Sequence, residues 1–387
     1  MTHNKHVITG KHFESNVQIE VEIEGGVITA IKEVSDELSN ESIIAPGLVD
    51  LQVNGYQGVD FNHKPLDQTQ WSQVIKSLAE VGVTCFYPTI ITNSNEALTE
   101  IFSGNIQQLK CIEHRHVVGG FHLEGPFISC QDGPRGAHAK EHVRPPSWDE
   151  FCRLQEVAEG EIKMITLSPE WQEATDFIKR AVQSGVKIAI GHTAANSEQI
   201  AEAVHAGATL STHLGNGAHP ELPRHPNYLW DQLAEDELWA SVIADGHHLP
   251  ESVVKTVHRM KVRKMILISD SVALAGMKPG TYETPVGGEV TLTSDGKLHL
   301  SENEELLAGS ASHLLDGVKH CVQKGIMEFP EAWCRASVQP AKYMGVTQEK
   351  GIQIGAPADL VVLRTVTNGW EVEQTYKGGE EVFKKGE

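Results

Sequence analysis

The sequence predicts an α/β protein: a (β/α)₈ TIM barrel with a small β-sandwich domain built from both chain termini. The main observation is an alternation of short, β-branched apolar runs with helical patterns, which is typical of parallel strands joined by helical crossovers. Eight such runs lie between about Pro46 and Tyr343. That span suits a barrel, which typically takes roughly 250 residues plus insertions.

The eight predicted strands share an apolar centre, and five of them follow a helical pattern. The first comes directly after the breaker Ala45-Pro46-Gly47. In chain order the strands are expected at residues 48–54, 82–89, 117–125, 162–170, 186–193, 208–216, 239–248 and 264–271. A closed barrel would bring their carboxyl ends together on one face.

The two ends of the chain instead alternate apolar and polar residues around Gly-Gly and Asn-Gly turn signals, as in VQIEVEIEGGVITAIKEV and GAPADLVVLRTVTNGWEVEQTYKGGEEVF. This pattern is typical of antiparallel strands. We expect a discontinuous β-domain of residues 1–45 and 351–387 beside a barrel of residues 46–350. A further hairpin pattern, residues 287–301 with an Asp-Gly turn, is expected beside the active face.

The composition narrows the class of protein. No apolar run approaches the roughly 20 residues of a membrane helix, and the segment MTHNKHVITGKHFE lacks the apolar centre of a signal peptide. The six cysteines are scattered without a CxxC pair, which indicates reduced thiols. We therefore expect a cytoplasmic protein that does not bind membranes.

The acidic balance argues against nucleic acid as a partner. Lys and Arg number 32 against 52 Asp and Glu, a formal net charge of −20, whereas a phosphate backbone requires clustered cations. A small phosphorylated ligand held by a few local donors is compatible with this charge. The 20 histidines are more informative, because several follow the end of a predicted strand.

Polar side chains mark the carboxyl ends of several predicted strands, where barrel enzymes place their active sites. These residues are Gln52, Asn54, Glu124, His192, His213, Asp245, His247, His248 and Asp270. Glu124, His192 and His213 supply one carboxylate and two imidazoles, a usual ligand set for catalytic zinc with an open position for water. Asp270 would accept a proton from that water and later deliver it to a leaving nitrogen.

Each of these residues also has an ordinary structural explanation. A histidine after a strand is commonly a hydrogen-bonded loop residue. Glu124 would serve equally as a helix cap or a lysine partner, and Asp270 as the N-cap of a helix beginning in SVALAG. Four such residues at four separate strand ends favour a hydrolytic metal site over these separate explanations.

Six segments in order carry a resemblance to a known family: PGLVDLQVNGYQG, FHLEGPF, GHTAAN, THLGN, IADGHH and ISDSVALAG. They resemble the N-acetylglucosamine-6-phosphate deacetylases of the amidohydrolase superfamily, over nearly the whole chain. The resemblance implies a hydrolase of a linear amide C–N bond that converts N-acetylglucosamine 6-phosphate to glucosamine 6-phosphate and acetate.

The resemblance also implies a single metal ion. Most amidohydrolases carry His-x-His after the first strand, where a second metal binds, but this chain has Gln52 and Asn54 there. Amides are poor zinc ligands compared with imidazole. The chain therefore resembles the single-metal branch, with one divalent ion, expected to be zinc, on Glu124, His192 and His213.

The remaining roles follow from the same resemblance. Asp270 matches the general acid/base, and His138 matches a loop histidine that stabilises the oxyanion. The substrate-binding matches are His248, Asn216, Gly217 and Arg224. The arginine matches one that reaches the phosphate of the neighbouring subunit, which implies a homodimer.

The chain departs from the family after His213. The family usually has a bulky residue followed by Asn-Ala-Met, whereas residues 213–219 read HLGNGAH and put glycines at the substrate rim. An amidohydrolase acting on another N-acyl sugar, an N-acyl amino acid or a cyclic amide therefore stays open as an alternative. A non-catalytic barrel is a weaker alternative, because all four reactive positions are filled.

Overall fold

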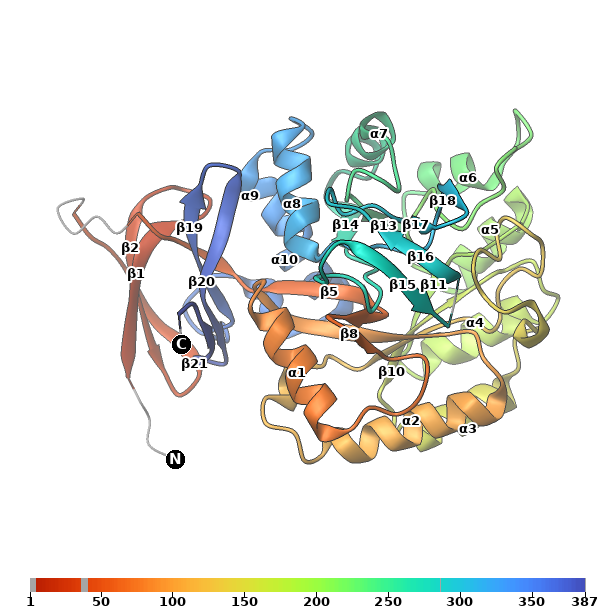
Figure 1. Cartoon of the computed structure of the whole chain (residues 1–387), viewed down its shortest axis with the longest axis horizontal. Coiled ribbons are helices and arrows are strands. Elements are labelled where there is room, and N and C mark those ends of the chain that lie inside the picture. The colour runs from red at the N-terminus through yellow and green to blue at the C-terminus, as the bar shows by residue number, and fades with distance from the viewer. Residues whose placement is uncertain (1–4, 36–40, 286, 387) are drawn as a thin grey trace.

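The chain forms a barrel and a separate sheet beside it, seen at the right and left of Figure 1. The structure is a computed structural model that describes residues 5–35, 41–285 and 287–386. Residues 1–4, 36–40 and 387 of the predicted β-domain lie outside the described residues. The boundaries expected at 45/46 and 350/351 stay predictions.

The predicted (β/α)₈ barrel is confirmed. Eight parallel strands lie in the order β14-β13-β12-β11-β10-β9-β8-β5, and a parallel bridge between Val53 and Ser271 joins the first strand to the last. Their bounds are β5 (Leu48–Val53), β8 (Val83–Ile91), β9 (Phe121–Glu124), β10 (Ile162–Leu167), β11 (Lys187–Ile190), β12 (Leu210–Ser211), β13 (Trp239–Ile243) and β14 (Met265–Ile268).

One helix follows each barrel strand and covers its outer side. These helices are α1 (Gln68–Ala79), α2 (Asn95–Leu109), α3 (Trp148–Val157), α4 (Ala174–Gln183), α5 (Ser197–Ala206), α6 (Tyr228–Ala234), α7 (Glu251–Lys261) and α8 (Leu314–Gln323). Capping boxes at Asp67 and Asn196 fix where α1 and α5 begin, because each side chain satisfies a helix N–H that has no partner within the helix.

The amino end of the barrel is closed by the helices after the last strand, α9 (Phe329–Arg335) and α10 (Val338–Met344). Tyr343 packs into the same inner cluster as Val49, Leu51 and Cys85. With this end filled by apolar side chains, the other end of the barrel is left to carry the site.

Both chain ends share one seven-stranded sheet, as predicted. Its order is β21-β20-β19-β4-β1-β2-β3. His6 of β1 stacks on Tyr376 of β20 at 5.8 Å between ring centroids, although two strands separate them, so the sheet curls over its own core. The strands are β1 (His6–His12), β2 (Gln18–Glu24), β3 (Val27–Glu33), β4 (Ile43–Pro46), β19 (Leu360–Val366), β20 (Gly369–Lys377) and β21 (Glu380–Lys384).

The predicted hairpin at residues 287–301 is the centre of a larger four-stranded sheet. It comprises β15 (Gly280–Thr284), β16 (Gly288–Leu292), β17 (Leu298–Leu300) and β18 (Asn303–Leu307). Val290, Leu292 and Leu298 give this sheet a small core of its own with Leu274. The short elements elsewhere are β6 (Gly55–Tyr56), β7 (Val59–Asp60), η2 (Arg115–Val117), η3 (Lys140–His142), η4 (Val262–Lys264) and η5 (Thr347–Lys350).

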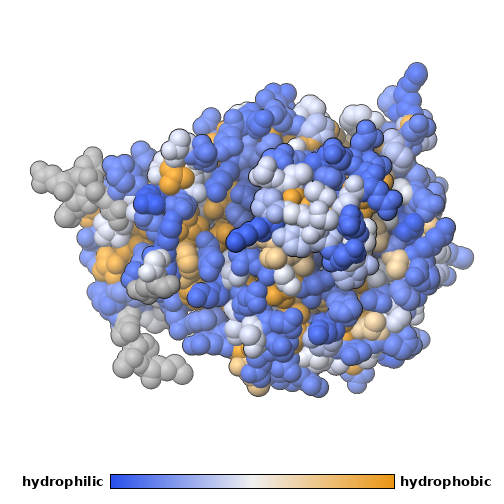
Figure 2. Space-filling view, in the orientation of Figure 1, coloured by the Kyte–Doolittle hydropathy of each residue, from blue (hydrophilic) through white to orange (hydrophobic). Residues whose placement is uncertain are grey.

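Hydrophilic residues cover most of the face shown in Figure 2, in keeping with the formal net charge of −20. None of the helices that the structure describes has the length and apolarity needed to cross a membrane. The six cysteines are all free thiols, as predicted.

Candidate active site

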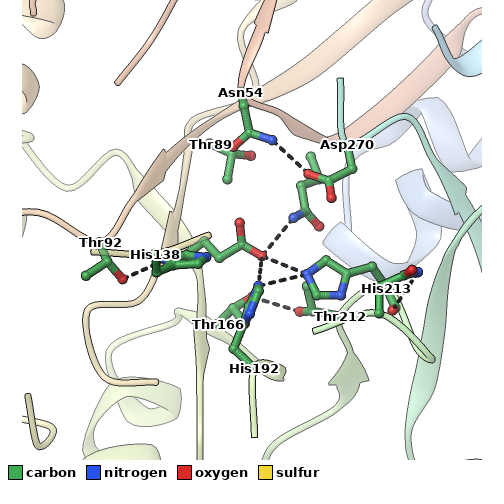
Figure 3. Close-up of polar contacts among 12 residues, drawn as sticks. Asn54, Thr89, Thr92, His138, Thr166, His192, Thr212, His213 and Asp270 are labelled. Carbon is green, nitrogen blue, oxygen red and sulfur yellow. Dashed lines mark hydrogen bonds and ion pairs between the residues drawn. The ribbon is translucent and has the colours of Figure 1, made fainter. Parts of the chain in front are cut away.

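Three side chains from three different strand ends meet at the carboxyl end of the barrel (Figure 3). Glu124 ends β9, His192 follows β11, and His213 follows β12. Glu124 Oε1 lies 3.1 Å from His213 Nε2 and 3.4 Å from His192 Nε2, and the two Nε2 atoms are 3.1 Å apart. The sequence placed these residues at the same barrel face, and the fold brings their ligand atoms together.

These separations fit one metal ion. Zinc–ligand bonds of about 2.0–2.1 Å at tetrahedral angles would space neighbouring ligand atoms roughly 3.3 Å apart. His192 Nδ1 lies 2.8 Å from the carbonyl oxygen of Pro134, which only accepts hydrogen bonds. Nδ1 of His192 therefore carries the proton, and Nε2 offers its lone pair to the cluster, as a metal ligand must.

The backbone is strained where the site residues leave their strands. His192 has φ +50°, His213 has φ +32° and Asp270 has φ +49°, a region that costs a non-glycine residue about 1–2 kcal/mol. Such outliers cluster at functional sites. Residues 271–279, which directly follow Asp270, contain turns and no helix, so the N-cap explanation for this aspartate is wrong.

The charges in the cluster are strongly coupled. Burial alone would raise the pKa of Glu124, but hydrogen bonds and charge from His192 and His213 hold it well below its usual range. Burial would lower the pKa of His213, yet Glu124 outweighs that effect and raises it. An acidic carboxylate facing two imidazoles makes an environment suited to a divalent cation.

Two amides at the end of the first strand, one in it and one directly after it, hold the carboxylates. Gln52 Nε2 donates to Glu124 Oε1 over 2.8 Å, and Asn54 Nδ2 donates to Asp270 Oδ1 over 2.7 Å. Both amides direct their NH₂ groups, which are donors, towards the centre of the site. Burial and the charge of Glu124 raise the pKa of Asp270 to about 6, close to the value that suits proton transfer near neutral pH.

His138 approaches the cluster from the loop after β9. Its ring centroid lies 4.4 Å from that of His192, and its Nδ1 lies 2.8 Å from Thr92 Oγ1. Burial lowers the pKa of His138 to about 3, so the imidazole is neutral. The Thr92 hydroxyl can donate to Nδ1, and in that tautomer Nε2 carries the proton and can donate into the site.

A cavity of about 530 Å³ opens above the cluster, within the range of small-molecule sites. Glu124, His138, His192, His213 and Asp270 all line it, together with residues of the four-stranded sheet β15–β18. That sheet therefore forms one wall of the cavity.

The predicted substrate-binding residues divide into two groups. His248, Asn216 and Gly217 line the cavity. Arg224 does not line it and lies exposed in the loop before α6. Among the described residues that line the cavity there is no Lys or Arg.

Sequence reasoning missed two positioning side chains. Thr92, the partner of His138, directly follows β8, which runs two residues beyond the expected end at Thr89. Asp245, noted only as a strand-end residue, accepts from His248 Nδ1 over 2.7 Å and from the backbone N–H groups of His247 and His248. A rule that checks the first polar residue after each strand would have found Thr92.

Comparison with known proteins gives consistent results. The Amidohydrolase family model matches residues 43–382. N-acetylglucosamine-6-phosphate deacetylase of Bacillus subtilis (strain 168) is 32% identical over 336 residues, covering 84% of this chain and 81% of the relative. The Homo sapiens enzyme of that name is 31% identical over 352 residues, covering 88% and 84%.

A solved structure agrees with these sequences. The N-acetyl-D-glucosamine-6-phosphate deacetylase of Mycobacterium smegmatis superposes with a TM-score of 0.86 at 25% identity, covering 97% of this chain and 100% of that one. A mutant of that enzyme has been solved in complex with N-acetyl-D-glucosamine-6-phosphate.

Proposed function

The chain belongs to the amidohydrolase family and, within it, to the N-acetylglucosamine-6-phosphate deacetylases, and from this premise we propose that it deacetylates N-acetylglucosamine 6-phosphate through the cluster at the barrel mouth. The products are glucosamine 6-phosphate and acetate. The observation that carries the proposal is the convergence of Glu124, His192 and His213 opposite Asp270 at the base of the cavity.

One divalent ion, zinc, is proposed to bind Glu124, His192 and His213. A metal there would polarise the amide carbonyl and acidify a water molecule. The orientation of Gln52 and Asn54 supports a single ion, because their NH₂ groups already donate to Glu124 and Asp270. Asn54 Oδ1 has no hydrogen-bond partner among the described residues, but an amide oxygen is a poorer zinc ligand than imidazole.

Asp270 is the proposed general acid/base. As a carboxylate it accepts the proton of the attacking water, and it then delivers that proton to the leaving nitrogen of the sugar. The hydrogen bond from Asn54 fixes its Oδ1 and leaves Oδ2 for proton transfer.

His138 is the proposed oxyanion donor. Its neutral ring keeps Nε2–H available, because Thr92 holds Nδ1. A preorganised donor at the developing negative charge stabilises the transition state more than the ground state.

The sugar phosphate is proposed to bind at the rim of the cavity. His248, oriented by Asp245, would contact the sugar or the phosphate, while Asn216 and Gly217 would contact the phosphate. The described lining residues include no Lys or Arg, so the strongest counter-charge would have to come from elsewhere. Arg224 of a second copy is the proposed source, which makes the enzyme a homodimer.

A substrate panel tests the function. We expect purified, zinc-loaded enzyme to release acetate from N-acetylglucosamine 6-phosphate with a much higher kcat/KM than from N-acetylglucosamine, because phosphate binding supports the chemical step. N-acetyl amino acids and a cyclic amide serve as the other arms. A preference for any of these over the sugar phosphate would contradict the proposal.

Mixing variants tests the homodimer. Arg224→Ala is expected to lower kcat/KM for the phosphorylated sugar, with a smaller effect on the unphosphorylated one. Mixed dimers of Arg224→Ala and Asp270→Asn should regain one working site, because each intact group comes from a different copy. If mixing restored no activity, the shared site would be contradicted.

The cytoplasmic location stays a prediction.

A further inference from the structure

A second group of metal-ligand side chains lies away from the cavity, where the barrel meets the terminal sheet. His114 and His116 precede β9, and Glu380 begins β21, the strand labelled near the C-terminus in Figure 1. Their ligand atoms all lie within 4.8 Å of one another. Because His114 and His116 lie before the amino end of β9, whereas Glu124 is at its carboxyl end, the two groups belong to opposite ends of the barrel.

The backbone turns sharply to bring the two imidazoles together. His114 has φ +58° and precedes η2 without making a side-chain capping bond. A left-handed conformation is unfavourable for a residue that is not glycine, and the usual compensation by a local side-chain hydrogen bond is missing here. The turn leaves the rings of His114 and His116 edge to face at 5.9 Å between centroids.

The facing atoms fit an ion better than they fit a hydrogen bond. Nδ1 of His114 is buried and has no hydrogen-bond partner among the described residues. It lies 3.5 Å from Glu380 Oε2, close to the roughly 3.3 Å between two ligands of one tetrahedral zinc. A buried polar nitrogen without a partner is destabilising, and a bound cation would remove that penalty.

The carboxylate of Glu380 is left available to bind a cation, because the nearby Lys377 is engaged with Asp359 over 2.9 Å.

We propose that His114, His116 and Glu380 form a second, structural site for a borderline divalent ion such as zinc, with water as the remaining ligand. Two imidazoles and one carboxylate suit zinc better than magnesium or calcium, which prefer oxygen ligands. The imidazoles come from the barrel and the carboxylate from the terminal sheet. A bound ion therefore clamps the two parts of the fold together and stabilises the folded chain by mass action.

Zinc binding to the enzyme already loaded at the cavity tests this proposal. Isothermal titration of wild-type protein with zinc chloride should reveal one further ion per chain. His116→Ala and Glu380→Gln should each weaken that ion at least about tenfold, the loss that even an outer-shell partner causes. His116→Ala keeps the contact between His114 and Glu380. If that contact were only an ion pair, zinc binding would not differ between this variant and the wild type.

His205→Ala is the matched control, because His205 is also an exposed histidine but lies on α5, outside the cluster. Added zinc should raise Tm in the wild type and in this control but not in His116→Ala. The deacetylation rate should be equal in all three proteins, which separates this site from the catalytic one. A wild-type protein that binds no further ion, or a further ion that survives both cluster variants, would overturn the proposal.

Discussion

The side-chain amide of Gln52 donates a hydrogen bond to Glu124 Oε1 over 2.8 Å. The first strand therefore supports a proposed metal ligand, at the position where the sequence resemblance places a second metal in most amidohydrolases. Figure 3 shows the related contact between Asn54 and Asp270. Together the two contacts explain how a barrel without His-x-His at this position can still order its site.

Removing the first contact should weaken the ion. Gln52→Leu keeps a similar volume but leaves Glu124 without its donor, and we expect zinc affinity to fall about 10–100-fold, as for other outer-shell partners. Competition with a chelator measures this affinity. Gln73→Ala, which removes a surface amide bond to the Gln57 carbonyl, is the control and should leave affinity unchanged. Equal affinity in both variants would contradict the role given to Gln52.

Asp270→Asn should lower kcat by about 10²–10⁴-fold, the usual contribution of a general acid/base. The bound zinc should be retained, because Asp270 is not one of the three proposed ligands. Steady-state kinetics with metal analysis checks both points. Near-normal turnover would contradict the assignment.

The fall of kcat/KM at low pH should reflect protonation of the Asp270 carboxylate. The pKa of this carboxyl is about 6 without bound metal, and a cation nearby would lower it. We therefore expect kcat/KM to fall as pH drops through about 6 or lower, because the protonated acid cannot accept a proton. The Asn54 hydrogen bond holds this pKa down, so Asn54→Leu should move this fall to higher pH. A fall that stays in place or moves to lower pH would argue against Asp270 as the base.

Thr92→Val should lower kcat by about tenfold while leaving KM nearly unchanged. The variant removes the hydroxyl that fixes Nδ1 of His138, whereas removing an oxyanion donor itself costs about 10²–10³-fold. Thr92→Ser should recover most of the rate, because it restores the hydroxyl. Equal rates for the valine and serine variants would show that the hydroxyl is irrelevant.

Gly217→Ala should disturb His192. A Cβ at this position would lie 2.8 Å from His192 Nδ1, and the backbone has φ +54°. We expect weaker zinc binding and a lower kcat. Gly185→Ala also has a left-handed φ, of +88°, but its Cβ would meet nothing within 4 Å. This control should lose some stability but no activity, and a loss of activity in both variants would point to backbone strain instead.

Lys261 should make the free energy of unfolding depend on pH in the alkaline range. Its Nζ donates to the carbonyl oxygens of Gln232 and Glu235, and burial lowers its pKa from 10.5 to about 8. Between these two values the unfolded chain binds more protons, so the free energy of unfolding should rise with pH, relative to Lys261→Met. Urea denaturation at pH 7.5 to 10 measures the difference. If the free energy of unfolding of the wild type fell with rising pH relative to Lys261→Met, the lowered pKa of Lys261 would be contradicted.

The sequence predicted the elements better than their ends. Buried parallel strands read as apolar runs with turn residues on either side, so all eight were found. The pattern could not say where hydrogen bonding stops: the run at 208–216 contains only the two-residue strand β12, while β8 continues to Ile91. Side chains placed by strand ends, such as Thr92, were missed for that reason.

Contacts between segments that are distant in the sequence were harder to predict. The cluster of His114, His116 and Glu380 depends on how the terminal sheet packs on the barrel, which no local pattern records. The proposed catalytic cluster could be predicted from the sequence, because barrel topology brings the carboxyl ends of all the strands to one face. Its second layer, including Asp245 and the Pro134 carbonyl, depends on loop conformations that the sequence does not specify.

Anomalous diffraction from crystals of the zinc-loaded enzyme tests the central claim most directly. The account predicts one peak in the cavity, about 2.0–2.2 Å from Glu124 Oε1 and the Nε2 atoms of His192 and His213, with Asp270 facing it. A cavity peak bound by Gln52 and Asn54 instead, or two peaks in the cavity, would contradict it.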